Sequence, residues 1–171
     1  MANINRTEIP LNKTKIALLL LGAIAFTALG LWFLLLQKNV LIYRVSGVIV
    51  VLVFGFAASI LARQLQDNTP GLIIDETGIS DNSSAVAAGQ ILWRDIKDVF
   101  VVEEGGHKFI MLEVRNPEKY IERQTHYLQK KAMQYNLKTY GSPLSITTDG
   151  LKYPFEKLYA LIKANFEQQT V

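Results

Sequence analysis

The segment Val101–Val114, VVEEGGHKFIMLEV, contains the residue types that support metal binding or acid–base catalysis. Two carboxylates, Glu103 and Glu104, are separated from His107 by a pair of glycines. A stable metal site commonly needs three or four ligands that converge on one point. In a folded hairpin, only Glu104 and His107 would face each other, so the spacing favours a turn over a metal or catalytic centre.

The same segment is typical of a β-hairpin. Apolar runs flank Gly105-Gly106, which suits the two-residue loop of a primed turn because both central residues must take positive φ. The register that follows predicts Glu103 opposite Lys108, a favourable cross-strand pair. It also places Asp98 opposite Glu113, two like charges, so we expect a bulge or slip farther from the turn.

Other catalytic patterns are missing from the sequence. His126 has no serine or acid at a spacing that would make it a catalytic base. The glycine pair lacks the lysine and helix that a phosphate-binding loop requires. The chain has no cysteine, which removes thiol catalysis and disulfides. We therefore predict a non-enzymatic protein with no catalytic residue, no cofactor and no metal.

Two uncharged runs, Ile16–Leu36 and Val45–Ala62, predict a transmembrane hairpin over residues 16–63. At about 1.5 Å per residue, a helix of either length is long enough for a hydrocarbon core of about 30 Å. A cleavable signal peptide has a shorter apolar stretch, and a soluble hairpin would have a polar face. We expect residues 1–15 to be an irregular tail and Gln37–Arg44 to be the loop between the helices.

The charges near the predicted helices indicate their orientation, because Lys and Arg tend to remain in the cytoplasm. Arg6, Lys13, Lys15 and Arg63 flank the outer ends of the hairpin, whereas Lys38 and Arg44 lie in its loop. This distribution predicts a multi-pass protein of the bacterial inner membrane with both termini cytoplasmic. Residues 64–171 have twelve Lys and Arg against fourteen Asp and Glu, a balance of −2, which argues against nucleic-acid binding.

Residues 71–168 read as a cytoplasmic domain of short antiparallel strands separated by turns. Asn116 and Pro117 suit the start of a helix, and we predict one amphipathic helix from Pro117 to Tyr135. Its apolar face would contain Ile121, Leu128, Ala132 and Tyr135. A closing helix is expected after Pro154. In that helix, apolar residues recur at helical spacing, namely Phe155, Leu158, Leu161, Ile162 and Phe166.

The polar face of the predicted helix 117–135 includes Lys119, Arg123 and Lys130. Because a short linker holds the domain near the inner leaflet, these residues are candidate contacts for anionic lipid headgroups. Glu118 and Glu122 dilute the charge, and a simply solvated face is the other reading.

Several segments spread over most of the chain carry a family resemblance, namely ILWRDIKDVFVVEEGGHKFIMLEV, GLIIDETGISDNSS, NPEKYI and YGSPLSI. With the apolar hairpin, they make the sequence similar to a family of uncharacterised bacterial inner-membrane proteins with a pleckstrin-homology-like C-terminal domain. The resemblance implies an α+β membrane protein with an antiparallel β-sandwich or barrel, an inserted helix and a C-terminal capping helix. It assigns no binding residues.

These observations predict a membrane-anchored, non-catalytic interaction or scaffold module. Its partners would be the lipid bilayer and either a partner protein or further copies of the chain. The alternative is a peripheral sensor of anionic lipid headgroups through Lys119, Arg123 and Lys130.

Overall fold

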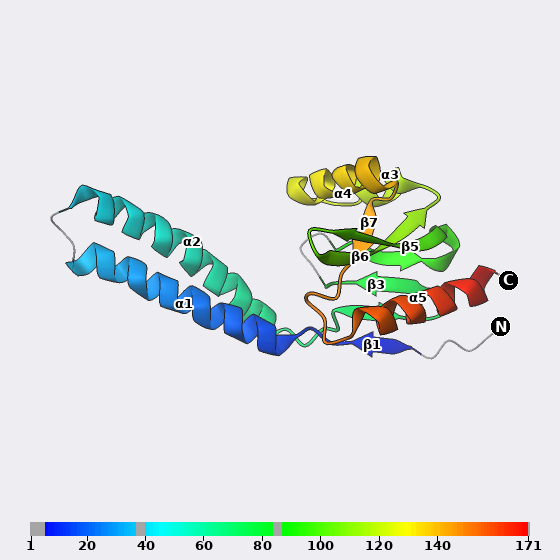
Figure 1. The fold of residues 1–171 in the computed structure, drawn as a ribbon, viewed down its shortest axis with the longest axis horizontal. Coiled ribbons are helices and arrows are strands. Elements are labelled where there is room, and N and C mark those ends of the chain that lie inside the picture. The colour runs from blue at the N-terminus through cyan, green and yellow to red at the C-terminus, as the bar shows by residue number, and fades with distance from the viewer. Residues whose placement is uncertain (1–5, 37–39, 84–86, 171) are drawn as a thin grey trace. The chain divides into compact units, whose positions relative to one another are not determined.

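The computed structural model describes residues 6–36, 40–83 and 87–170 (Figure 1). The chain divides into two compact units. A hairpin unit spans Asn12–Thr69, and a β-rich unit is built from the segments on both sides of it. The protein is therefore α+β, with two long apolar helices and two antiparallel sheets.

The hairpin unit consists of α1 (Lys13–Leu36) and α2 (Leu41–Gln66), both long and apolar enough to cross a membrane. Each helix extends beyond its apolar run, because the flanking Lys, Arg and Gln residues are good helix formers. The expected loop residues Leu41–Arg44 are consequently helical, whereas Gln37–Asn39 lie outside the described residues. Gly30 and Gly47 lie at the helix contact, where a Cβ on Gly47 would stand 2.9 Å from the Gly30 carbonyl oxygen.

The first sheet has the order β1-β2-β3-β4, formed by Thr7–Ile9, Leu72–Ile74, Gly78–Asp81 and Gly89–Leu92. The prediction of a mostly irregular tail was wrong at Thr7–Ile9, where β1 pairs with β2, and at Lys13–Lys15, where α1 already begins, whereas residues 1–5 lie outside the described residues. Ile9 is fully buried. A three-residue strand followed by a proline is too short for its alternation to be recognised.

The second sheet has the order β5-β6-β7, formed by Ile96–Glu104, His107–Val114 and Leu144–Ile146. The predicted hairpin is confirmed, with Glu103 opposite Lys108 and positive φ at both Gly105 and Gly106. The expected bulge lies between Ile96 and Asp98, although Asp98 itself remains opposite Glu113. The bulge leaves Lys97 to pair with Glu113, their Nζ and Oε1 atoms 2.5 Å apart.

The predicted helix Pro117–Tyr135 is two helices, α3 (Pro117–Glu122) and α4 (Tyr127–Tyr140). Asn116 caps α3 as expected, its side chain accepting a hydrogen bond from the Lys119 amide. His126, however, has extended backbone that separates the helices. This break changes the buried face, so Leu128 and Tyr135, expected in the core, are 77% and 57% exposed.

One apolar core joins both sheets and the helices of the β-rich unit. The closing helix is α5 (Phe155–Thr170), which buries Leu158, Ile162 and Phe166 as its spacing predicted. A short 3₁₀ turn, Trp93–Asp95, connects β4 to β5. Trp93 is buried there, and its indole Nε1 donates to the Asp75 carbonyl oxygen at 2.8 Å.

Candidate functional site

The structure places Glu104 and His107 opposite each other but gives them different partners. Glu104 accepts a hydrogen bond from the Tyr140 hydroxyl. His107 Nδ1 lies 3.0 Å from Asp149 Oδ2, beside the loop that follows β7. Within residues 6–36, 40–83 and 87–170, no group of three or more His, Cys, Asp or Glu residues is arranged to hold a metal. These polar contacts therefore tie the hairpin tip to neighbouring segments.

The three basic candidates do not form one free surface. Lys119 Nζ is 2.5 Å from Asp95 Oδ2. Arg123 donates to the carbonyl oxygens of Gln90, at 2.9 Å, and Ala88. Lys130 is half-buried on α4. The basic residues nearest β4 and the 3₁₀ turn are thus used to attach α3 to the rest of the unit.

Tyr120 is the buried centre of that attachment. Its hydroxyl donates to Asp95 Oδ2 at 2.7 Å, and the Arg123 guanidinium lies over its ring at 5.1 Å. Burial and this hydrogen bond raise the pKa of Tyr120 to about 12. The hydrogen bond from Lys119 lowers the pKa of Asp95. A neutral phenol and an ionised carboxylate are therefore the stable forms, and the cluster is structural.

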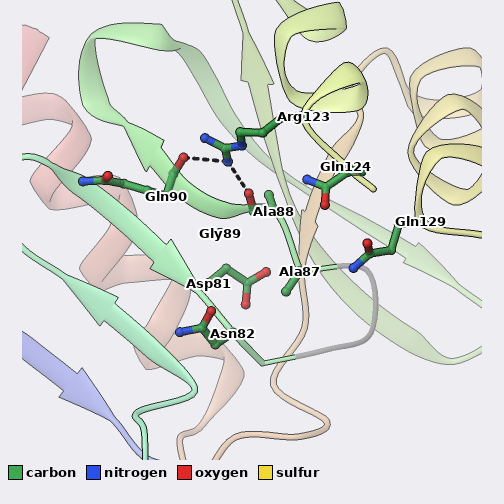
Figure 2. A pocket seen from close by; sticks show the side chains of 9 residues that line it. All are labelled: Asp81, Asn82, Ala87, Ala88, Gly89, Gln90, Arg123, Gln124 and Gln129. Carbon is green, nitrogen blue, oxygen red and sulfur yellow. Dashed lines mark hydrogen bonds between the residues drawn. The ribbon is translucent and has the colours of Figure 1, made fainter. Parts of the chain in front are cut away.

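A polar recess of about 510 Å³ lies between the β3–β4 end of the first sheet and the α3–α4 segment. Figure 2 shows the residues that line the two sides of the recess, with Arg123, Gln124 and Gln129 across from the residues of β3 and β4. We call it the amide-lined recess, because side-chain amides predominate among its polar groups. Its lining residues are Asp81, Asn82, Ala87, Ala88, Gly89, Gln90, Arg123, Gln124 and Gln129.

Asp81 stabilises the sheet side of the recess. It is 1% exposed, and its Oδ1 accepts hydrogen bonds from the Ser83 amide at 2.8 Å and the Ser83 hydroxyl at 2.6 Å. Burial raises the pKa of Asp81, although hydrogen bonds from Ser83 and the Ala88 amide oppose the shift. A carboxyl satisfied in this way fixes the chain where it leaves β3, and it does not act as an exposed base.

Arg123 closes the other side. By bonding the Ala88 and Gln90 carbonyl oxygens, it occupies backbone acceptors at the edge of β4 (Figure 2). Asn82 is exposed at the rim, and the Gln124 amide is half-buried. Gln90 Nε2 donates to Thr77 Oγ1 and Gln124 Nε2 donates to the Tyr120 carbonyl oxygen, both at 3.3 Å. Because each side-chain amide has two donor hydrogens and an acceptor oxygen, the lining still suits a ligand that hydrogen-bonds through several neutral groups, such as a polypeptide segment.

Sequence reasoning missed this recess. Asn82 follows β3 and Gln90 lies in β4, whereas Gln124 and Gln129 come from the α3–α4 segment, and the two pairs share no sequence motif. Arg123 alone was singled out, for a role at the membrane surface. The sequence signal was weak, since Gln124 and Gln129 are separated by four residues and stand beside Lys130 and Lys131.

Comparison of the chain with protein-family models, curated proteins and solved structures finds no match.

Proposed function

We propose that this protein is a membrane-anchored, non-catalytic interaction module. A hairpin spans the bacterial inner membrane, and a cytoplasmic β-rich domain binds a polar segment of a partner protein in the amide-lined recess. The observation that carries the proposal is the pairing of β1 with β2 across the hairpin. Two membrane-length helices are thereby inserted between neighbouring strands of a folded binding domain.

The surfaces of α1 and α2 support insertion into lipid. Their apolar side chains are largely exposed, including Leu21 and Leu52 at 64% and 67%. Thr27 and Ser59 donate their hydroxyls to carbonyls of their own helices, which satisfies polar groups where water is absent. Trp32 and Tyr43, near the connection between the helices, are suited to a membrane interface. An aqueous environment would leave this apolar surface unfavourably hydrated.

The pairing of β1 with β2 also supports the proposed topology. Strands in one sheet must be on the same side of a bilayer, so the chain enters and leaves the membrane from one face. Lys13, Lys15 and Arg63 flank the ends of the helices at that membrane face, and basic residues beside a transmembrane helix favour the cytoplasmic side. The proposed protein therefore has both ends of its hairpin in the cytoplasm.

The strand order supports a pleckstrin-homology-like fold for the β-rich unit. Four antiparallel strands, then three, are followed by a C-terminal helix whose apolar residues enter the shared core. In this arrangement, the transmembrane hairpin occupies the β1–β2 connection, and α3 with α4 occupies the β6–β7 connection. Fold alone does not assign a ligand.

The binding role is supported by the recess. Its lining offers amides from two segments and lacks a nucleophile paired with a base among the residues described. The alternative sensor using Lys119, Arg123 and Lys130 has weaker support, because Lys119 and Arg123 already make intramolecular bonds.

Site-specific photocrosslinking in living cells tests the proposal. The full-length protein would carry a benzophenone amino acid at Asn82, on the rim of the recess, or at Lys157, an exposed control position on α5. We expect an adduct of defined mass at Asn82, absent at Lys157 and reduced by Gln124→Ala. Identical adduct patterns at both positions, or none at Asn82, would contradict binding in the recess.

A further inference from the structure

The outward side of α4 has an unusual composition for a solvated helix. Tyr127, Leu128, Lys131, Tyr135 and Lys138 share this side, which we call the outer face of α4. Tyr127 and Leu128 are 67% and 77% exposed, and Tyr135 is 57% exposed. Among the described residues of the β-rich unit, the other exposed large hydrophobic residue is Val101, at a lower 40%. The exposed apolar surface of this unit is therefore concentrated on one helix.

The break at His126 produces this face. Because α4 starts a new helical phase, Met133 enters the core and Leu137 packs against it. The positions on the opposite side, including Leu128 and Tyr135, then point away from the core. In the single helix that the sequence predicted, they would share a face with Ile121, which is buried.

The charge of α4 differs from that of its surroundings. The helix contains Lys130, Lys131 and Lys138 and no acidic residue. The remaining part of residues 64–171 has nine basic against fourteen acidic residues. Lys131 Nζ lies over the Tyr127 ring at 4.9 Å, and neither Lys131 nor Lys138 forms a salt bridge within the described residues. The outer face is thus cationic and aromatic within an acidic domain.

We propose that the outer face of α4 binds the anionic surface of the bilayer in which the hairpin is anchored. Tyr127, Leu128 and Tyr135 enter the interfacial layer, while Lys131 and Lys138 bind lipid phosphates. Tyrosine with lysine and a large aliphatic residue is the composition of helices that lie at such interfaces. This inference rests on the membrane anchor of the proposed function, but it uses a surface separate from the recess.

Tethering favours lipid as the occupant. One residue, Asn12, separates the Leu11 bridge position from α1, so the bilayer is always present at high effective concentration. A weak surface contact then becomes intramolecular and needs no deep groove. The two lysines complement anionic headgroups, whereas the acidic remainder of the domain is repelled by them.

Spin labels on the full-length protein in nanodiscs test this contact. The chain has no cysteine, so single labels can be placed by Leu128→Cys, Val101→Cys and Leu52→Cys. The discs contain phosphatidylcholine alone or an equal mixture with phosphatidylglycerol. Collision of each label with a neutral, water-soluble nickel chelate reports its exposure, because a neutral reagent is not repelled by the lipid charge.

We expect the chelate accessibility at position 128 to fall severalfold in the anionic discs and to stay unchanged at position 101. The double substitution Lys131→Gln and Lys138→Gln should restore the accessibility, since two lysines near a charged surface change the contact equilibrium about 30-fold. High salt should act in the same direction.

Equal accessibility at position 128 in both kinds of disc would overturn the inference. Protection that required an added protein extract would also overturn it, by assigning the face to a protein partner. The label at position 52 separates these results from failure of the anchor. It should be protected in both discs, and chelate access there would contradict the proposed function itself.

Discussion

Thr7 faces Ile74 across two antiparallel strands, although both long apolar helices lie between these residues in the chain. The pairing continues through Ile9 and Leu72, both fully buried. The segment before the hairpin is therefore part of the β-rich unit. If the helices are membrane-spanning, this one sheet determines that the hairpin begins and ends on the same side.

Single cysteines should reveal that topology. Glu8→Cys on β1 and Glu118→Cys on α3 replace exposed residues in the β-rich unit. In intact spheroplasts, both should resist a membrane-impermeant maleimide and react after lysis, because the proposed topology places both positions in the cytoplasm. Val40→Cys, beside the start of α2, should react before lysis. Labelling of Glu8→Cys and Glu118→Cys on opposite sides would be incompatible with the β1–β2 pair.

Ile9 should be essential to the stability of the β-rich unit. Ile9→Ala removes a fully buried side chain and should lower the free energy of unfolding by about 2–5 kcal/mol. The chain has two tryptophans, so Trp32→Phe leaves buried Trp93 as the fluorescent reporter of denaturation. The matched control is Glu8→Ala on the same strand, where the exposed ion pair with Arg6 should contribute less than about 1 kcal/mol. Similar effects of the two substitutions would show that β1 is not integrated into the core.

The contrast between β1 and the β5–β6 hairpin shows what the sequence encodes locally. Gly105-Gly106 and the alternating residues around it determine a turn and a register within one short segment, so Glu103 and Lys108 could be paired in advance. The partner of Thr7 is distant in the chain, and three residues give too little alternation to identify a strand. Pairing of β1 with β2 depends on the packing of Ile9, which local sequence does not reveal.

The helix after β6 was mispredicted for a related reason. Asn116 and Pro117 mark its start clearly. Thr125 and His126 have intermediate helix propensities, which are too high to predict a break between two helices. Arg123 then bonds the edge of β4, and the restarted helix buries Met133 in place of Leu128. The recess depends on this break as well, since Arg123 and Gln129 line it from opposite sides of the interruption. Local propensity was too weak to predict a site made by tertiary contacts.

Tyr120 should give the domain a characteristic loss of stability at alkaline pH. Its pKa is about 12 in the folded protein, against an ordinary value of 10.0. The stabilisation is complete below pH 10 and is lost as the pH rises toward and through 12. Tyr120→Phe should therefore lower stability by about 1–2 kcal/mol at neutral pH and flatten the pH dependence between 10 and 12.

Trp93 fluorescence in the Trp32→Phe background would measure this dependence by denaturation at each pH. Tyr127→Phe, at an exposed position, is the control and should leave the curve unchanged. Tyr140 also has a pKa of about 12, raised by its hydrogen bond to Glu104, so the informative quantity is the difference between the Tyr120→Phe and reference proteins. An unchanged slope in Tyr120→Phe would exclude Tyr120 as the source of the pH dependence.

Gly30 should control the close packing of the two apolar helices. A Cβ at this position would lie 2.9 Å from side-chain carbons of both Val50 and Val51. Gly22, in the same helix, has no such neighbour within 4 Å in the part of the chain described. Leucine is a good helix former at either position, so Gly30→Leu and Gly22→Leu differ mainly in whether the helices must separate.

A disulfide between Thr27→Cys and Gly55→Cys would measure that separation, because a Cβ on Gly55 would lie 4.0 Å from Thr27 Cγ2. This approach is compatible with disulfide formation after a small adjustment. Oxidation of the two cysteines in isolated membranes should form the disulfide at similar rates in the double-cysteine protein and in its Gly22→Leu variant. The Gly30→Leu variant should form it at least several-fold more slowly. A leucine at position 30 leaves no room for α1 and α2 to keep their contact. Equal rates in all three proteins would therefore show that the two helices are not in contact at Gly30.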